Sequence, residues 1–480
     1  MIMNVAPKLF PKQKTDNARV IAADSKSLDS GPANWSAGTE SRGEPVLAEG
    51  DVQRRKALMI AYHFPPQMGS SGLLRSLKYC RYLPEHGWIP TVLTVHPRAY
   101  EKVDQSQLRD IPENVKVIRA FAMDTRKHLS LRNRYLRYTA LPDRWVTWCL
   151  GAVPAGLLEI YKSKTNVILT TFPVASAVLN GYLLHRITGV PWVADFRDPM
   201  TEDDYPCDPQ TRRLLRWLER KAVRHASRLI FTAGSTVQMY LQRYPELSAG
   251  KCLVISNGYD EEDFSGLPET RNHQQCAAVR MQHSGLIYPE ERDPVPFFMA
   301  LSRLKKEERI SAQWFSVDLR ACGHPERYQE IVAQLGIQDL VHFPSAIPYR
   351  QALQDSSQSD ILLLLQGASC DHQIPAKTYE YLRLRKPILA LTSTAGDTAA
   401  VLNECGGATI ADISDEEAIY QVLPEVLSAV RAGTHPLPKL EIVSKYSRQK
   451  QAQELARCLS AAIEGETTGA PDTERSAAGL

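Results

Sequence analysis

The feature that most constrains the fold of this chain is a regular alternation of short apolar runs with helical patterns. The runs are four to seven residues long and rich in β-branched or large apolar side chains, as buried strands of a parallel sheet should be. In the first half the predicted strands are 56–62, 90–95, 115–120, 167–171, 192–196, 229–232 and 253–256. In the second half they are 279–283, 314–320, 341–344, 361–365, 388–391 and 408–411.

Helical patterns lie between most of these strands. The predicted helices are 73–86, 176–188, 209–226, 236–243, 295–306, 325–335, 349–358, 377–383, 398–405 and 416–432. Alternating strands and helices favour doubly wound parallel sheets, so two successive sets predict an α/β protein with two Rossmann-like domains facing a cleft. Ligands of such domains bind beyond the carboxyl ends of the strands, and we therefore expect functional residues directly after strands.

Composition sets the predicted boundaries. Residues 1–50 are rich in Ser, Ala, Gly, Asp and Pro without a hydrophobic period, which predicts a disordered leader, and 464–480 predict a similar tail. The predicted domains are 51–262 and 263–446, joined within the polar stretch 257–276, with a terminal helix over 447–463 that returns to the first domain.

The overall composition excludes several classes of protein. A hydrophobic share of 43%, a charged share of 23% and a net charge of +3 are typical of a soluble globular protein without a field for nucleic acid. The nine cysteines include no Cys-x-x-Cys pair, which argues against disulfides and zinc and suits a reducing cytosol. The chain start lacks the apolar core of a signal peptide, and no apolar run reaches the roughly 18 residues of a membrane span. We therefore expect a cytoplasmic protein.

Two loops of the first predicted domain carry candidate binding groups. The loop after the first strand ends in Gly69, Ser70, Ser71 and Gly72. Free N–H groups at the start of the next helix would attract an anion there, although a plain tight turn explains the glycines equally well. Arg197 and Asp198 follow the predicted strand 192–196, where they either face the cleft or form a structural ion pair.

The second predicted domain carries three further candidate groups. Gly285 and Arg292 follow the strand 279–283, and a guanidinium is well suited to a diphosphate, although an exposed arginine is the alternative. Lys377 and Glu380 are three residues apart and share one helix face, either as a surface ion pair or as a site for phosphate and sugar hydroxyls.

The last group is Gly396, Asp397 and Thr398, in the loop after strand 388–391. Its Asp and Thr would cap a helix whatever else they do. Cys370, Asp371 and His372 crowd together, but consecutive residues rarely converge on one ion, so we expect no metal site.

These residues together are similar to those of bacterial GT-B glycosyltransferases of retaining family 4. The stretches that carry the resemblance are AYHFPPQMGSSGLLRSLKYCRYLPEHGWIPTVLT, PWVADFRDP, VISNGYDEEDF, HSGLIYPEERDP and IPAKTYEYLRLRKPILAL, in the family's order. The resemblance implies transfer of a sugar, with retention and without a metal, from a UDP-type or GDP-type nucleotide-sugar. The acceptor would be a saccharide or lipid-linked molecule of cell-envelope or exopolysaccharide biosynthesis.

The resemblance also assigns roles to the candidate residues. Arg292 and Lys377 would neutralise the diphosphate leaving group, and Glu380 would bind the donor ribose. The loop that ends at Gly72 would approach the donor phosphates or the acceptor. Arg197 and Asp198 would lie near the sugar. The loop 395–398 would close on the donor, and Gly285 would also contact the donor.

The sequence departs from the family at one position. His372 stands where the first glutamate of the family's Glu-x7-Glu motif would lie, and it is expected to hydrogen-bond a sugar hydroxyl instead. This departure keeps a non-catalytic nucleotide-sugar-binding protein open as an alternative, and a GT-B nucleotide-sugar epimerase is a second one.

A basic stretch with interleaved aromatic residues lies in the acceptor-side domain. It comprises Arg126, Lys127, Arg132, Arg134, Tyr135, Arg137, Tyr138, Arg144, Trp145 and Trp148. Such a stretch suits the anionic inner face of the cytoplasmic membrane, and a solvated loop with partly buried aromatics is the alternative.

Overall fold

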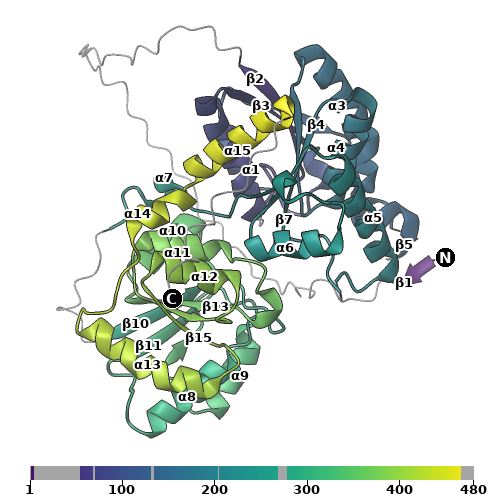
Figure 1. Cartoon of the computed structure of the whole chain (residues 1–480). Coiled ribbons are helices and arrows are strands. Elements are labelled where there is room, and N and C mark those ends of the chain that lie inside the picture. Colours follow the sequence, from purple (N-terminus) through teal and green to yellow (C-terminus); the bar gives the residue numbers. More distant parts are fainter. Residues whose placement is uncertain are drawn as a thin grey trace, which may run out of the picture.

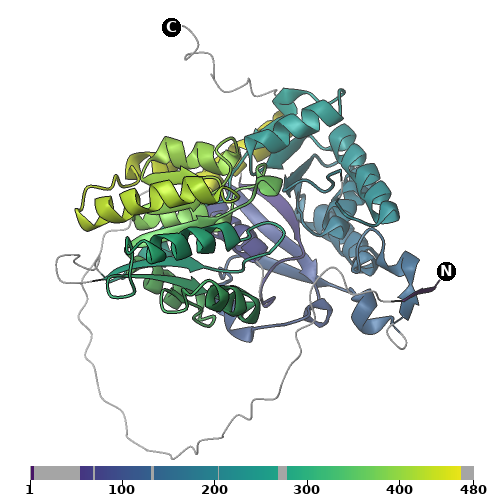
Figure 2. The same ribbon diagram turned by 90° about the horizontal axis from the view of Figure 1, so that it is seen from below.

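The computed structural model describes residues 2–4, 54–68, 71–130, 134–203, 205–268 and 278–465. In this part of the chain, two parallel sheets with helices on both faces form two domains, which Figures 1 and 2 show side by side. The predicted fold class is therefore confirmed. Most of the predicted leader and tail lies outside the described residues. Within the leader, β1 (Ile2–Asn4) pairs antiparallel with β5 (Arg134–Leu136), and residues 464 and 465 of the predicted tail end the last helix.

The first domain is built on a seven-stranded parallel sheet within the described residues. Its strands are β2 (Arg55–Ala61), β3 (Trp88–Val95), β4 (Lys116–Ala120), β6 (Val167–Thr171), β7 (Trp192–Arg197), β8 (Arg228–Phe231) and β9 (Cys252–Val254). Their order is β4-β3-β2-β6-β7-β8-β9. Strands β3 and β4 are added on one side of β2 and the later strands on the other, so the switch point lies between β2 and β6. All seven predicted strands of the first half are present, with ends that differ by at most two residues.

Helices cover both faces of this sheet with separate apolar cores. One face packs against α3 (Cys149–Ser163), α4 (Ala175–Thr188) and α5 (Pro209–His225). The other face packs against α1 (Ser71–Tyr82) and the last helix, α15 (Arg448–Glu464). Figure 1 shows α15, in yellow, crossing from the second domain to lie beside α1.

The second domain repeats this plan on a six-stranded parallel sheet. Its strands are β10 (Val279–Ser284), β11 (Phe315–Arg320), β12 (Val341–His342), β13 (Ile361–Leu365), β14 (Ile388–Leu391) and β15 (Ala408–Ala411). Their order in the described chain is β12-β11-β10-β13-β14-β15, which places the reversal between β10 and β13. One face packs against α8 (Val295–Lys306), α9 (Pro325–Gln334) and α13 (Glu416–Arg431). The other carries α10 (Tyr349–Ser357), α11 (Ala376–Leu384), α12 (Asp397–Cys405) and α14 (Leu440–Val443).

Helix α3 was not predicted, because Gly151, Pro154 and Gly156 interrupt its helical sequence pattern. Glycine and proline lower the helix propensity of a segment, but here tertiary packing decides. A side chain on Gly151 would place its Cβ 2.5 Å from the backbone oxygen of Phe121, so the glycine allows α3 to approach that backbone.

The two domains are joined around a short helix, α7 (Glu261–Phe264), which contains the predicted boundary at 262/263. Glu261 accepts hydrogen bonds from Nε and Nη2 of Arg383 in the second domain, and Phe264 packs in the core beneath α11. After α14 the chain returns beside this connection, where the Arg448 backbone N–H donates to the Tyr259 carbonyl over 2.8 Å. Across the described residues, no helix combines the length and apolar character needed to cross a membrane.

Candidate functional site

The site lies at the switch point of the second sheet, where β10 and β13 are neighbours. Loops diverge there because the chain leaves the two strands toward opposite faces, and this opens space for a ligand at the carboxyl edge. His283 near the end of β10 hydrogen-bonds the Leu363 carbonyl of β13 through Nδ1, over 2.9 Å. The predicted Lys377 is next to this pair, in the first turn of α11.

Lys377 is held over the end of β10 without an anionic partner. Its Nζ lies 3.0 Å from His283 Nε2, and no carboxylate of the described residues lies within ion-pair distance. Gly285 has a φ of 125°, a backbone conformation that favours glycine, and a Cβ there would lie 2.9 Å from Nζ and displace the amine. Burial, reinforced by the charge of Arg292, lowers the pKa of Lys377 to about 7.

Arg292 reaches the same edge of the sheet from the loop after β10. Its guanidinium lies over the Tyr288 ring, 5.4 Å from the ring centroid, and Nη1 contacts the Leu286 carbonyl at 3.5 Å. The Nε atom is buried and has no hydrogen-bond partner among the described residues. Two basic groups thus act on each other at this edge, with no ion pair to a carboxylate of the described residues, and a bound anion would relieve their repulsion when both are charged.

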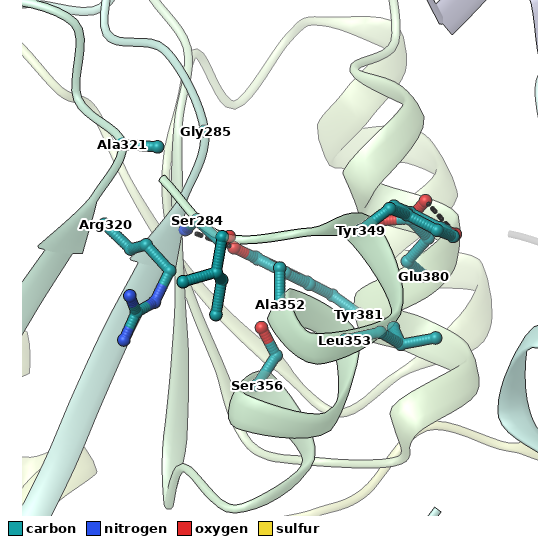
Figure 3. A pocket seen from close by; sticks show the side chains of 11 residues that line it. Ser284, Gly285, Arg320, Ala321, Tyr349, Ala352, Leu353, Ser356, Glu380 and Tyr381 are labelled. Atoms are coloured by element: carbon teal, nitrogen blue, oxygen red, sulfur yellow. Dashed lines mark hydrogen bonds between the residues drawn. The ribbon is translucent and has the colours of Figure 1, made fainter. Parts of the chain in front are cut away.

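Glu380 lies one helical turn beyond Lys377 and faces a pocket (Figure 3). Its Oε1 accepts a hydrogen bond of 2.9 Å from the Tyr349 hydroxyl of α10. Burial raises the pKa of Glu380, and this hydrogen bond opposes the rise. The pocket is lined by Ser284, Gly285, Arg320, Ala321, Ile347, Tyr349, Ala352, Leu353, Ser356, Glu380 and Tyr381.

Arg197 and Asp198 belong to the first domain, at the carboxyl end of β7. Arg197 has a left-handed φ of 61°, and the β7–β8 register shifts beside it. Its guanidinium is buried, donates to the Phe172 carbonyl at 3.4 Å and leaves Nε without a described partner. Asp198 accepts from Thr232 at 3.4 Å. The buried ion pair of this region is formed by other residues. Nε and Nη2 of Arg75 in α1 donate to the two carboxylate oxygens of Asp195, over 2.8 and 3.3 Å.

The loop that precedes α1 is partly described. Gly69 and Ser70 lie outside the described residues, Ser71 begins α1, and Gly72 is buried in its first turn. The predicted anion contact of this loop therefore stays a prediction.

Two further predicted residues connect the domains. His372 Nε2 lies 2.9 Å from Glu202 Oε1, and the His372 carbonyl accepts from Thr236 at 2.8 Å. The Glu202 carboxylate raises the pKa of His372, chiefly through this hydrogen bond. Asp397 at the start of α12 accepts from the Ser235 hydroxyl and, at 3.2 Å, from the Ser235 N–H.

Gly396 and Thr398 support the loop that carries Asp397. A side chain on Gly396 would meet the Asp371 carboxylate at 2.9 Å. Thr398 is buried and donates its hydroxyl proton to the Gln366 side-chain oxygen, with the Gln373 carbonyl oxygen as a second, longer contact at 3.3 Å, so its side chain holds the loop in place. A hydrogen bond from the Thr398 hydroxyl to a nucleotide-sugar would require the loop to rearrange.

The structure thus brings Gly285, Arg292, Lys377 and Glu380 to one edge of the second sheet. Among the described residues there is no group of three or more His, Cys, Asp or Glu side chains that could hold a metal ion. Sequence reasoning missed His283 and Tyr349 as parts of the site. His283 carried a signal, because a histidine at the end of an apolar strand needs a partner, whereas Tyr349 begins an ordinary amphipathic helix.

Known proteins share this architecture. A glycosyltransferase of Rickettsia africae superposes with a TM-score of 0.60 at 12% identity, covering 86% of this chain and 100% of its own. HepE of Anabaena, solved with UDP and glucose, gives a TM-score of 0.57 at 14% identity, with 85% and 100% covered. Sucrose-phosphate synthase of Thermosynechococcus elongatus gives 0.59 at 13% identity, with 86% and 100% covered. No curated protein sequence matches the chain.

Two facing α/β domains with a site at the switch point of the second sheet define a protein of the GT-B fold. More particularly, residues 74–258, which make up most of the first domain, match the family model of the glycosyl transferase 4-like domain. The resemblance to GT-B, family 4-like glycosyltransferases that the sequence motifs predicted is therefore confirmed.

Proposed function

We propose that the protein is a glycosyltransferase that moves a sugar, with retention, from a nucleotide-sugar to a saccharide or lipid-linked acceptor. The observation that carries the proposal is the pair of unneutralised cations, Lys377 and Arg292, beside the pocket that Glu380 lines. A diphosphate would satisfy both cations, and a carboxylate in the same pocket is a natural acceptor for ribose hydroxyls.

The geometry is suited to stabilising a leaving group. As the bond between the sugar and the diphosphate breaks, negative charge grows on the phosphate oxygen, and Lys377 and Arg292 would stabilise it in place. The facing residues Arg197 and Asp198 of the first domain would contact the sugar or its acceptor. Such a reaction needs orientation of the two substrates more than a protein nucleophile, and retention would follow if the acceptor attacks the face of the sugar that the diphosphate leaves.

The nucleotide of the donor is proposed to be UDP. HepE, which has the same fold, was solved with UDP and glucose, with UDP alone and with UDP-glucose. A cytoplasmic role in cell-envelope or exopolysaccharide biosynthesis would supply both a nucleotide-sugar and a growing saccharide.

Binding of UDP tests the proposed donor site. Calorimetry should show that Arg292→Ala and Glu380→Ala each weaken UDP binding by about 10-fold or more, the effect of losing a charge-assisted contact. Lys306→Ala, on the exposed surface of α8, is a matched control and should bind as the wild type does. If both site variants bound UDP normally, the donor site would be elsewhere.

Activity separates the transferase from its alternatives. Incubation with UDP-sugars and candidate acceptors should release UDP in proportion to product. Conversion of the UDP-sugar to an epimer without an acceptor would instead identify an epimerase. Tight binding without turnover for any acceptor would favour a non-catalytic role, and absence of any nucleotide-sugar binding would refute the transferase proposal.

We further propose that the first domain rests on an anionic membrane surface. Arg137 and Arg144 of the predicted basic stretch pair with carboxylates, so the exposed Arg126 and Lys127 would supply the attraction. Trp148 is fully buried and Trp145 stacks on Tyr62 with Arg144 over it at 4.4 Å, so these aromatics of the predicted stretch are core residues. Tyr138, however, is 78% exposed. The outer face of α3 adds Leu150, Pro154, Leu158 and Tyr161, all exposed and spaced to form one stripe.

Vesicle sedimentation tests this surface. The protein should pellet with vesicles containing anionic lipid at low salt and stay in solution with neutral vesicles. The double variant Leu150→Asn, Leu158→Asn changes exposed side chains alone, so it should keep its thermal stability and lose most of the pelleting. Wild-type protein that stays in solution with anionic vesicles would refute the proposal.

A further inference from the structure

His283 has a fixed tautomer in this structure. It is completely buried near the end of β10, and its Nδ1 lies 2.9 Å from the Leu363 carbonyl oxygen. A carbonyl oxygen can accept a hydrogen bond but cannot donate one, so Nδ1 must carry the proton. The other ring nitrogen, Nε2, therefore presents a lone pair, and the Lys377 amine at 3.0 Å is its donor.

Lys377 is fixed by this contact and by the shape of the strand end. The amine lies beside both the imidazole and Gly285, where a Cβ would come to 2.9 Å from Nζ and push the amine out of this position. The nearby Glu380 carboxylate does not pair with it and accepts from Tyr349 instead. Lys377 thus has a precise position, a neutral acceptor and a second cation, Arg292, beside it.

We propose that His283 is a positioning residue that holds the Lys377 amine at the switch point, and that diphosphate binding there is coupled to proton uptake by Lys377. The inference rests on the proposed function, because the donor diphosphate is the anion that would bind. A carboxylate in place of His283 would hold the amine equally well but would neutralise the charge that the diphosphate needs.

The charges around Lys377 determine the direction of the coupling. His283 faces it from β10, Arg292 from the following loop and Glu380 from α11. Burial and Arg292 outweigh Glu380, so the pKa of Lys377 is about 7. Burial and Lys377 keep the pKa of His283 well below its usual range, so the imidazole stays neutral.

The sign of the effect follows from this balance. A bound diphosphate stabilises the ammonium form and raises the pKa of Lys377. Well below pH 7 the amine is already charged and no proton is taken up, whereas at pH 7 about half of the amines are neutral. Between pH 7 and the raised value, binding draws in up to one proton, and affinity falls by up to about 10-fold per pH unit.

Calorimetric titration with UDP at pH 8, in two buffers of different ionisation enthalpy, measures this proton directly. The wild type should take up close to one proton for each UDP bound. Lys377→Arg should bind UDP with little or no proton uptake, because a guanidinium stays charged at this pH. This control also subtracts any proton bound by UDP itself. Binding by the wild type without uptake would overturn the inference and leave the proposed function standing.

Variants of His283 test the positioning role. Glutamine can place its carbonyl oxygen near the position of Nε2, whereas phenylalanine keeps the ring volume and removes the acceptor. His283→Gln should bind UDP within about threefold of the wild type with the same pH profile, and His283→Phe should lose about 10-fold and the pH coupling.

Circular dichroism and thermal melting establish that each variant is folded. A folded His283→Phe variant with wild-type affinity and pH profile would overturn the positioning role. If that variant failed to fold, the comparison of wild type with Lys377→Arg would still decide the proton coupling. No binding of UDP, GDP or ADP by the wild type would overturn the proposed function and this inference with it.

Discussion

At the scale of single residues, the charged side chains of the site have neutral hydrogen-bond partners. Lys377 has an imidazole as its partner, and Glu380 has a phenol. Neither side chain is neutralised by an opposite charge at hydrogen-bonding distance, so both keep their ability to bind a ligand. A direct Lys377–Glu380 ion pair, which the spacing alone would allow, would have consumed both groups. The donor-site interpretation of this spacing is thus favoured by the partners each residue has.

Glu380 should give nucleotide binding an acid limit. Burial raises the pKa of Glu380, and a protonated carboxyl is a poor acceptor for ribose hydroxyls, so UDP binding should weaken as pH falls through the raised pKa. Tyr349→Phe removes the hydrogen bond that opposes this rise, so the loss should begin at higher pH. The measurement is the Kd for UDP between pH 4.5 and 8. Glu380→Gln should bind UDP more weakly at every pH, and its Kd should not rise at acid pH. If the rise in Kd at acid pH were unchanged in this variant, another group would be responsible for it.

At the scale of elements, the last helix belongs to the core of the first domain although it is the end of the chain. Leu455 and Leu459 of α15 are fully buried against that sheet. Leu459→Ala should lower the free energy of unfolding by about 2–5 kcal/mol, the usual cost of a large-to-small change in a core. Denaturant unfolding measures it, with exposed Arg457→Ala as a control. Hydrogen exchange should show reduced amide protection in α1 and β2 of this variant. Reduced protection in the second domain alone would contradict the packing of α15 on the first domain.

The elements were the most predictable level of this structure. All of the predicted strands exist because buried parallel strands leave continuous apolar runs in a sequence, as at 361–365. Helix α3 was missed because its glycines serve contacts with Phe121 and Leu184 that no local pattern contains. The site was predictable in the residues that follow strands. His283 and Tyr349 could not be assigned roles, since each depends on a partner distant in sequence.

At the scale of the whole molecule, partly exposed polar contacts connect the facing loops of the two domains. His372 meets Glu202, and Asp397 meets Ser235. These contacts are partly exposed, so each contributes little by itself. His372 therefore acts as a contact between domains in this structure, and the expected bond from His372 to a sugar hydroxyl would compete with Glu202. Opening and closing of a GT-B protein would exchange such contacts.

The contact between His372 and Glu202 should make domain closure depend on pH. Because Glu202 raises the pKa of His372, protonation and closure favour each other. The stabilisation should be complete below the ordinary histidine value of about 6.5 and be lost as pH rises through the raised value. Small-angle X-ray scattering of the ligand-free protein should show a smaller radius of gyration at pH 6 than at pH 8.5, with the closed-to-open ratio changing by roughly threefold. Glu202→Gln should remove this dependence, whereas Ser235→Ala should weaken closure equally at both pH values. A dependence that survives in Glu202→Gln would show that another titrating group controls the cleft.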